Sequence, residues 1–95
     1  DMRSHRGPNS ANRQPAPSPE TAFLGSAQVR WLADALAASR ATWKVVAADM
    51  PLGLVVGHQP GFHEAAANAD PGPPLGRELE IAGLLKTLKA RRVRN

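Results

Sequence analysis

Apolar residues recur at helical spacing in two separate stretches of the 95-residue chain. In the first stretch, five of them follow at intervals of three, one, three and one residues, on one face of a helix: Val29, Leu32, Ala33, Leu36 and Ala37. Gly25 and Ser26 precede this face and offer an N-cap, while Ser39 and Arg40 mark its end. The pattern predicts a helix over 26–40.

The second stretch carries its apolar face at intervals of four, three, three and three residues: Leu75, Leu79, Ala82, Leu85 and Leu88. Ile81 and Leu84 widen this face. Glu78 and Glu80 lie in the early turns and basic residues lie in the last turn, an arrangement that the helix dipole favours. We therefore predict a second helix, over 75–92.

A short and almost continuous apolar run lies between the two helices. Residues 42–48 include Trp43, Val45 and Val46, and only Lys44 among them is charged. Aromatic and β-branched residues in such a run are typical of a strand that is buried on both faces. Pro51 follows soon afterwards and cannot join a central ladder. The run therefore predicts a strand over 42–48.

The other segments show no clear periodicity. Residues 1–22 contain four prolines, which remove backbone donors and disfavour helix, so we expect an irregular segment there. Residues 57–74 are rich in Gly and Pro, and an irregular stretch of that length is usually a functional loop or disordered. Residues 1–4 and 93–95 are interpreted as strand remnants at the two ends of the chain.

The order of helix, strand, long loop and helix favours an α/β fold. A strand that is buried on both faces needs a neighbour on each side, and only one complete strand is predicted. We therefore interpret residues 1–95 as one partial domain, a fragment of a larger α/β structure.

The net charge of +4 comes from the C-terminal end of the second predicted helix. Five basic residues and no acidic ones lie between positions 86 and 95: Lys86, Lys89, Arg91, Arg92 and Arg94. A nucleic-acid surface would usually add interleaved aromatic residues, which are absent here, so a solvated helix end is favoured and no nucleic-acid partner is expected. The alternative is a small basic module that binds an acidic partner or nucleic acid through this helix.

Other composition features exclude classes of site. The chain has no Cys, which excludes disulfides, thiolate metal ligands and a Cys nucleophile. Its longest apolar runs are far shorter than the ~20 residues of a membrane-spanning helix, so no membrane partner is expected. Neither a Gly-x-Ser-x-Gly motif nor a phosphate loop with a following Lys is present.

Two groups of residues are candidates for chemistry. His58 and His63 with Glu64 form the chain's one histidine–carboxylate cluster, but metal sites commonly need three or four ligands, so surface histidines are favoured there. Asp1, Arg3 and Arg6 combine a carboxylate with two guanidinium groups, which suit bidentate recognition of phosphate. These three are the candidate substrate-binding residues, and a structural ion pair is the alternative.

Four segments resemble one known family in consistent order. The opening D-M-R-S-H-R-G-P-N is similar to the D-x-R-x-Y-R segment of the PhoD-like, alkaline phosphatase D-type enzymes. F-L-G-S-A-Q-V-R-W-L resembles their helix entry, and A-T-W-K-V-V-A-A-D-M-P-L-G-L resembles the strand and turn that follow. G-P-P-L-G-R-E-L-E-I-A resembles the helix after the long loop. His5 stands where the family usually has Tyr.

The resemblance implies a calcineurin-like metallophosphoesterase sandwich, in which helices flank a β-sandwich. It further implies hydrolysis of phosphate monoesters and diesters with iron and calcium, and a periplasmic or extracellular location. The family's metal-binding motifs match no position of this sequence, so no metal ligand or catalytic residue is assigned here. We expect the parent protein to be a hydrolase and these 95 residues to be inactive alone and to bind no metal.

Overall fold

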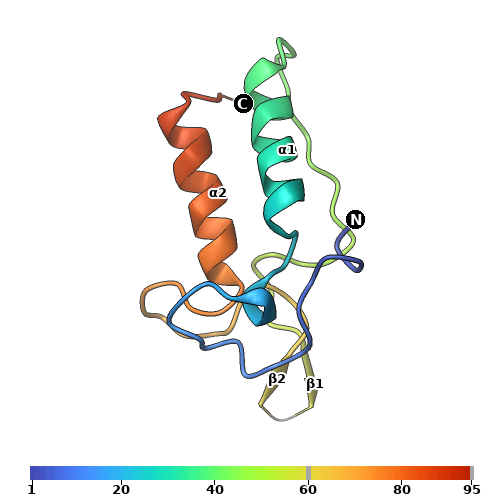
Figure 1. Cartoon of the computed structure of the whole chain (residues 1–95), viewed down its shortest axis with the longest axis vertical. Helices are drawn as coiled ribbons and strands as arrows, with labels where there is room; N and C mark the ends of the chain where they lie inside the picture. Colours follow the sequence, from blue (N-terminus) through green and yellow to red (C-terminus); the bar gives the residue numbers. More distant parts are fainter. Residues whose placement is uncertain (60, 95) are drawn as a thin grey trace.

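The computed structural model describes residues 1–59 and 61–94, with the backbone alone for 57–59. Its main elements are two helices, α1 (Ser26–Ala38) and α2 (Glu78–Ala90), which lie side by side and point the same way (Figure 1). At their C-terminal ends Arg91 pairs with Asp34. Both helices lie where the sequence predicts them, and each is shorter than its predicted range.

Local backbone chemistry sets where the helices begin. Gly76 has a φ of 57°, in the left-handed region, so α2 starts after it rather than at Leu75. Gly25, with a φ of 81°, is the N-cap of α1 and brings no capping side chain of its own. Ser26 is the first helical residue rather than the cap.

The chain between the helices returns along α1 in the opposite direction (Figure 1). Residues 42–48 belong to no strand among the described residues, where the sequence predicts one. Trp43 and Val45 are 78% and 85% exposed rather than buried. The physical reason is that a strand needs neighbouring backbone to pair with, and no described segment lies beside this one as a ladder.

The one sheet among the described residues is a short antiparallel hairpin inside the predicted loop 57–74. It pairs β1 (Gly57–Gln59) with β2 (Phe62–His63), and Ser10 bridges to His63. The predicted irregular segment 1–22 contains one turn of 3₁₀-helix, η1 (Pro19–Thr21).

The strand remnants predicted at the two ends are not strands within the described residues. Residues 1–4 form a turn, because the Asp1 carboxylate accepts hydrogen bonds from the backbone N–H groups of Arg3 and Ser4. Val93 and Arg94 follow α2 without joining a ladder. Asn95 lies outside the described residues.

The buried core lies at the end of the molecule where the helices begin. Its members are Met2, Phe23, Met50 and Ala66, with Leu24 and Ile81 packed against them. Between the helices, Ala33 and Leu84 are buried, whereas Leu85 of the predicted face is 60% exposed. Leu84, which widens the predicted stripe of α2, is therefore more deeply buried than Leu85 of the stripe itself.

Candidate functional site

The polar candidate residues gather at the end where both helices begin. Residues 1–25, 49–59 and 61–77 lie there, around the carboxyl end of the extended segment 42–48 (Figure 1). The fully buried polar side chains of Asn12, Asn68 and Arg77 belong to these segments. This end of the molecule, the loop end, is therefore the candidate site.

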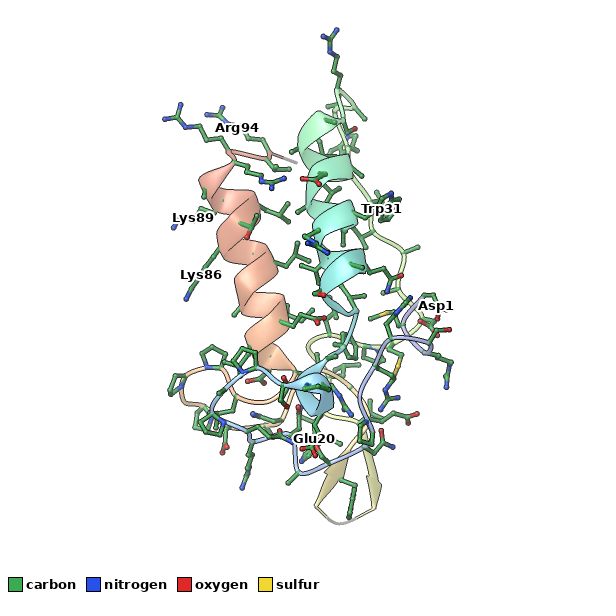
Figure 2. The ribbon with its side chains drawn as sticks, viewed as in Figure 1. Asp1, Glu20, Trp31, Lys86, Lys89 and Arg94 are labelled. Carbon is green, nitrogen blue, oxygen red and sulfur yellow. The ribbon has the colours of Figure 1, made fainter. Side chains whose placement is uncertain are left out.

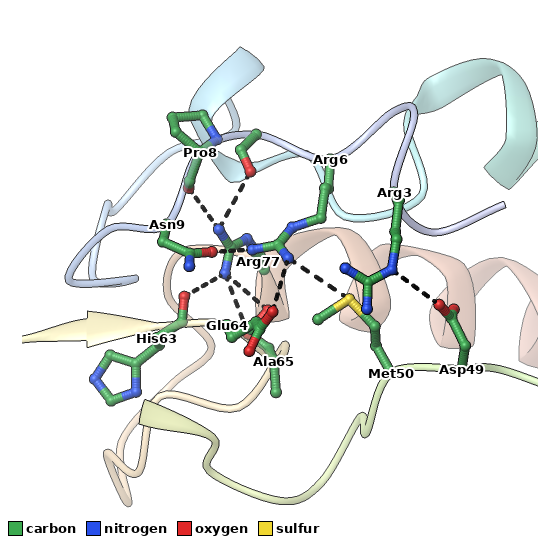
Figure 3. Close-up of polar contacts among 11 residues, drawn as sticks. Arg3, Arg6, Pro8, Asn9, Asp49, Met50, His63, Glu64, Ala65 and Arg77 are labelled. Atoms are coloured by element: carbon green, nitrogen blue, oxygen red, sulfur yellow. Dashed lines mark hydrogen bonds and ion pairs between the residues drawn. The ribbon is translucent and has the colours of Figure 1, made fainter. Parts of the chain in front are cut away.

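The three predicted substrate-binding residues lie near one another but do not form one ion cluster. The carboxylate of Asp1 is occupied by its own turn, where it also accepts from the Ser4 hydroxyl. Arg3 pairs instead with Asp49, at 3.5 Å from Nε to Oδ2, and both side chains are largely exposed. Arg6 lies deeper and has other partners (Figure 3).

The Arg6 guanidinium is held on several sides. Its Nη2 donates to Asn9 Oδ1, and Nη1 lies 3.6 Å from the sulfur of Met50. Nη1 is also 3.8 Å from Oε1 of Glu64, and the Arg6 side chain is 11% exposed. Arg6 is therefore largely buried beside an acidic partner, while the Arg3 side chain is mostly exposed.

Arg77 is the most deeply buried charged residue of this end, with no exposed surface. Its Nη1 donates to three consecutive carbonyl groups, those of His63, Glu64 and Ala65, at 2.8, 3.3 and 3.3 Å. Its Nη2 donates to the carbonyl groups of Gly7 and Pro8, at 3.4 and 2.5 Å (Figure 3).

Burial, and secondarily the repulsion by Arg6, lowers the pKa of Arg77, whereas Glu64 opposes the shift. The cost of burying this charge is offset chiefly by the five carbonyl dipoles, because none of its hydrogen bonds goes to a carboxylate.

Two acidic residues that follow Arg77 fasten further loops. Glu80 accepts from the backbone N–H groups of residues 23–25, with 2.5 Å from Leu24 N to Oε1. It thereby ties the N-cap Gly25 and the two residues before it to the start of α2, with its negative charge near the N-terminus of α1. Glu78 accepts from Asn68 N at 3.0 Å. The sequence 77–80 thus joins four loop segments to the start of α2.

A pair of buried asparagines closes the same end. Asn12 donates to the carbonyl of Ala66 and accepts from the backbone N–H of Arg77, both at 2.7 Å. Asn68 donates to the carbonyl of Asn12 at 3.1 Å. Both side chains are completely buried. Their amides take the place of backbone pairing between irregular segments.

Of the predicted histidine–carboxylate cluster, the structure describes the side chains of His63 and Glu64. The side chain of His58 lies outside the described part of the chain. His63 contributes its backbone carbonyl to Arg77, and Glu64 contributes its carboxylate to Arg6. Among the described residues, no three of His, Asp and Glu lie close enough together to hold a metal ion. The residues present thus do not fit the iron and calcium that the resemblance implies, and we derive no chemical step through a metal.

The basic residues of the C-terminal end lie at the opposite pole (Figure 2). Lys89 and Arg94 are exposed there, with the exposed Lys86 lower on the same helix, and Lys44 donates to the Arg94 carbonyl at 3.0 Å. Both helices end at this pole, so the positive charges lie where two helix dipoles are negative.

Sequence reasoning missed the residues that organise the site. The two glutamates of R-E-L-E were assigned to their own helix dipole, although an acidic residue there can also cap a neighbouring helix. Nothing in a single sequence marks Arg77 as buried, because Arg is mostly exposed.

In the part of the chain described, no helix is long and apolar enough to cross a membrane.

Comparison with known proteins gives the wider context of this arrangement. Searches of the curated proteins and of the solved structures found no match. A family model, described as PhoD-like phosphatase, matches residues 1–95. Since that match covers the whole chain, including the arginine-bearing loops and both helices, the chain belongs to the PhoD-like phosphatase family.

Proposed function

We propose that this chain forms part of the catalytic domain of a metal-dependent phosphoesterase that hydrolyses phosphate monoesters or diesters. The observation that carries the proposal is the family match over residues 1–95. The loop end supports it, because two arginines with guanidinium groups suited to phosphate lie there, each beside a carboxylate.

The proposed fold is the calcineurin-like sandwich, in which residues 42–48 become a strand. Support comes from the exposed apolar side chains of this segment, such as Trp43 and Val45. Its backbone also lacks ladder partners among the described residues. Neighbouring strands would remove both features at once, since they would pair the backbone and cover the side chains.

Arg3 and Arg6 are the proposed substrate-binding residues. Both carry guanidinium groups that match phosphate oxygens in pairs, and both have a carboxylate partner that holds the side chain in place. Asp1 supports them indirectly, because its carboxylate fixes the turn from which Arg3 extends.

The test uses the full-length protein, loaded with iron and calcium, on p-nitrophenyl phosphate and bis(p-nitrophenyl) phosphate. We expect Arg6→Met to raise KM about tenfold or more, because a charge-assisted contact to phosphate is worth roughly 1.5–3 kcal/mol. Arg13→Met is the matched control, since Arg13 pairs with Asp70 and touches neither Arg3 nor Arg6. An inactive wild-type enzyme would refute the proposed function.

The second prediction concerns the 95-residue chain by itself. Following the resemblance, we propose that its iron and calcium ligands come from residues outside 1–95. The purified chain should then release no p-nitrophenol above background when both metals are added. Turnover that disappears with a chelator would contradict this proposal and would place a complete metal site within these residues.

A further inference from the structure

We propose that Arg77 is a positioning residue for Arg6: by clamping the backbone on both sides of the Arg6–Glu64 pair, it holds the Arg6 guanidinium where the substrate phosphate binds. The inference rests on the proposed function, because it needs Arg6 to contact the substrate. It goes further by assigning a role to a residue that touches no substrate.

The clamp joins two segments that are far apart in the sequence. Nη2 of Arg77 binds the carbonyls of Gly7 and Pro8, the two residues that follow Arg6. Nη1 binds the carbonyl of Glu64 itself and those of its two neighbours. One guanidinium thereby fixes the main chain that carries each member of the Arg6–Glu64 pair (Figure 3).

The choice of acceptors leaves the acidic partner available for Arg6. Arg77 makes its five hydrogen bonds to main-chain oxygens, and Glu64 contributes a carbonyl rather than its carboxylate. That carboxylate lies 3.8 Å from Nη1 of Arg6. The guanidinium groups of Arg6 and Arg77 can therefore both lie at this end. The Glu64 carboxylate pairs with Arg6, and main-chain carbonyl groups accept the hydrogen bonds of Arg77.

The planar guanidinium group of Arg77 is needed to hydrogen-bond residues 7–8 and residues 63–65 at the same time. The two terminal nitrogens of Arg77 point at different loops, three acceptors on one side and two on the other. Lysine has a single ammonium group, which cannot reach two separated rows of carbonyls. Arg77→Lys should keep the charge and part of the packing but release one of the two loops.

The test is a double-mutant cycle in the metal-loaded full-length protein. The variants are Arg77→Lys, Arg77→Met and Arg6→Met, with each Arg77 change also placed in the Arg6→Met background. KM and kcat for p-nitrophenyl phosphate are measured per folded molecule, well below the melting temperature of each variant. Arg77→Lys is included because Arg77→Met leaves buried carbonyls unpaired and is the variant more prone to misfolding.

We expect Arg77→Lys to raise KM about tenfold in the wild-type background, and to change it less than twofold once Arg6 is Met. Arg91→Lys is the matched control, since Arg91 pairs with Asp34 of α1 rather than with the Arg6 loop. It should leave KM unchanged.

An equal rise in KM in both backgrounds, or no rise in either, would overturn the positioning role. A purely structural role would instead lower the folded fraction and leave KM untouched. These outcomes are distinct from failure of the proposed function, which would appear as an inactive wild-type enzyme.

Discussion

At the scale of single residues, the glycine at position 76 allows the start of α2 to approach the segment around Asn12. Gly76 has a φ of 57°, and a Cβ atom there would lie 2.5 Å from the main-chain carbonyl of Asn12. That approach lets Asn12 accept from the N–H of Arg77. The residue before the R-E-L-E segment must therefore lack a side chain if the asparagine is to reach its partner.

Gly76→Ala should lower the stability of the protein by about 2–4 kcal/mol. The substitution forces a non-glycine residue into the left-handed region and pushes Cβ against backbone that cannot rotate away. The free energy of unfolding, from urea titration of the full-length protein, measures the effect.

Gly83→Ala is the control for that comparison, because Gly83 lies in the interior of α2 with nothing within 4 Å of its added Cβ. It should stabilise the protein by about 0.5–1 kcal/mol through helix propensity alone. A Gly76→Ala variant as stable as the wild type would show that Asn12 does not need this close approach.

At the scale of elements, the helices were predictable and the packing of the loops was not. The 3.6-residue spacing of apolar residues is a local property, and it placed both helices within a few residues of α1 and α2. The run 42–48 has the composition of a strand, but a strand also requires a pairing partner, which composition cannot supply. The same limit applies to the site, since Arg3 and Arg6 were recognisable by type and their partners Asp49 and Glu64 were not.

The cap of α1 illustrates a contact between elements that sequence cannot show. Its N-cap residue is Gly25, and the N–H groups of Gly25 and of the two residues before it donate to the carboxylate of Glu80, 55 positions from Gly25. This contact fixes the parallel arrangement of the helices, because it ties the start of one to the start of the other.

Glu80→Gln should therefore destabilise the protein by about 1–2 kcal/mol, since it removes a charge from the helix N-terminus and weakens hydrogen bonds to three N–H groups. Glu20→Gln, at an exposed position of η1, should change stability by less than about 0.5 kcal/mol. Equal melting temperatures for the two variants would argue against the cap.

At the scale of the whole molecule, the segment 43–55 leaves many of its large apolar side chains exposed. Large side chains along 43–55 are exposed: Trp43, Val45, Val46, Leu52, Leu54 and Val55. Beside them lies an apolar groove of about 270 Å³ between the helices and the extended segment, with Trp31 and Leu85 at its wall. Exposed surface of this kind normally marks a contact with other polypeptide.

The proposed sandwich requires that residues 42–48 be buried as a strand in the full-length protein. One substitution, made both in the full-length protein and in the separate 95-residue chain, tests this requirement. In the full-length protein, Val45 would lie inside the sheet, so Val45→Lys should cost about 2–4 kcal/mol by burying an unpaired charge. In the separate 95-residue chain Val45 is 85% exposed, and the same lysine should instead reduce self-association in sedimentation experiments, because it interrupts an open β-prone edge.

Ala27→Lys, on an exposed position of α1, should have little effect in either context. If Val45→Lys left the full-length protein as stable as Ala27→Lys does, residues 42–48 would be a surface segment there too. Val45→Lys is thus expected to harm the full-length protein and to improve the behaviour of the separate chain for one reason. Residues 42–48 have the side chains of a central strand, and the neighbouring strands would come from residues outside 1–95.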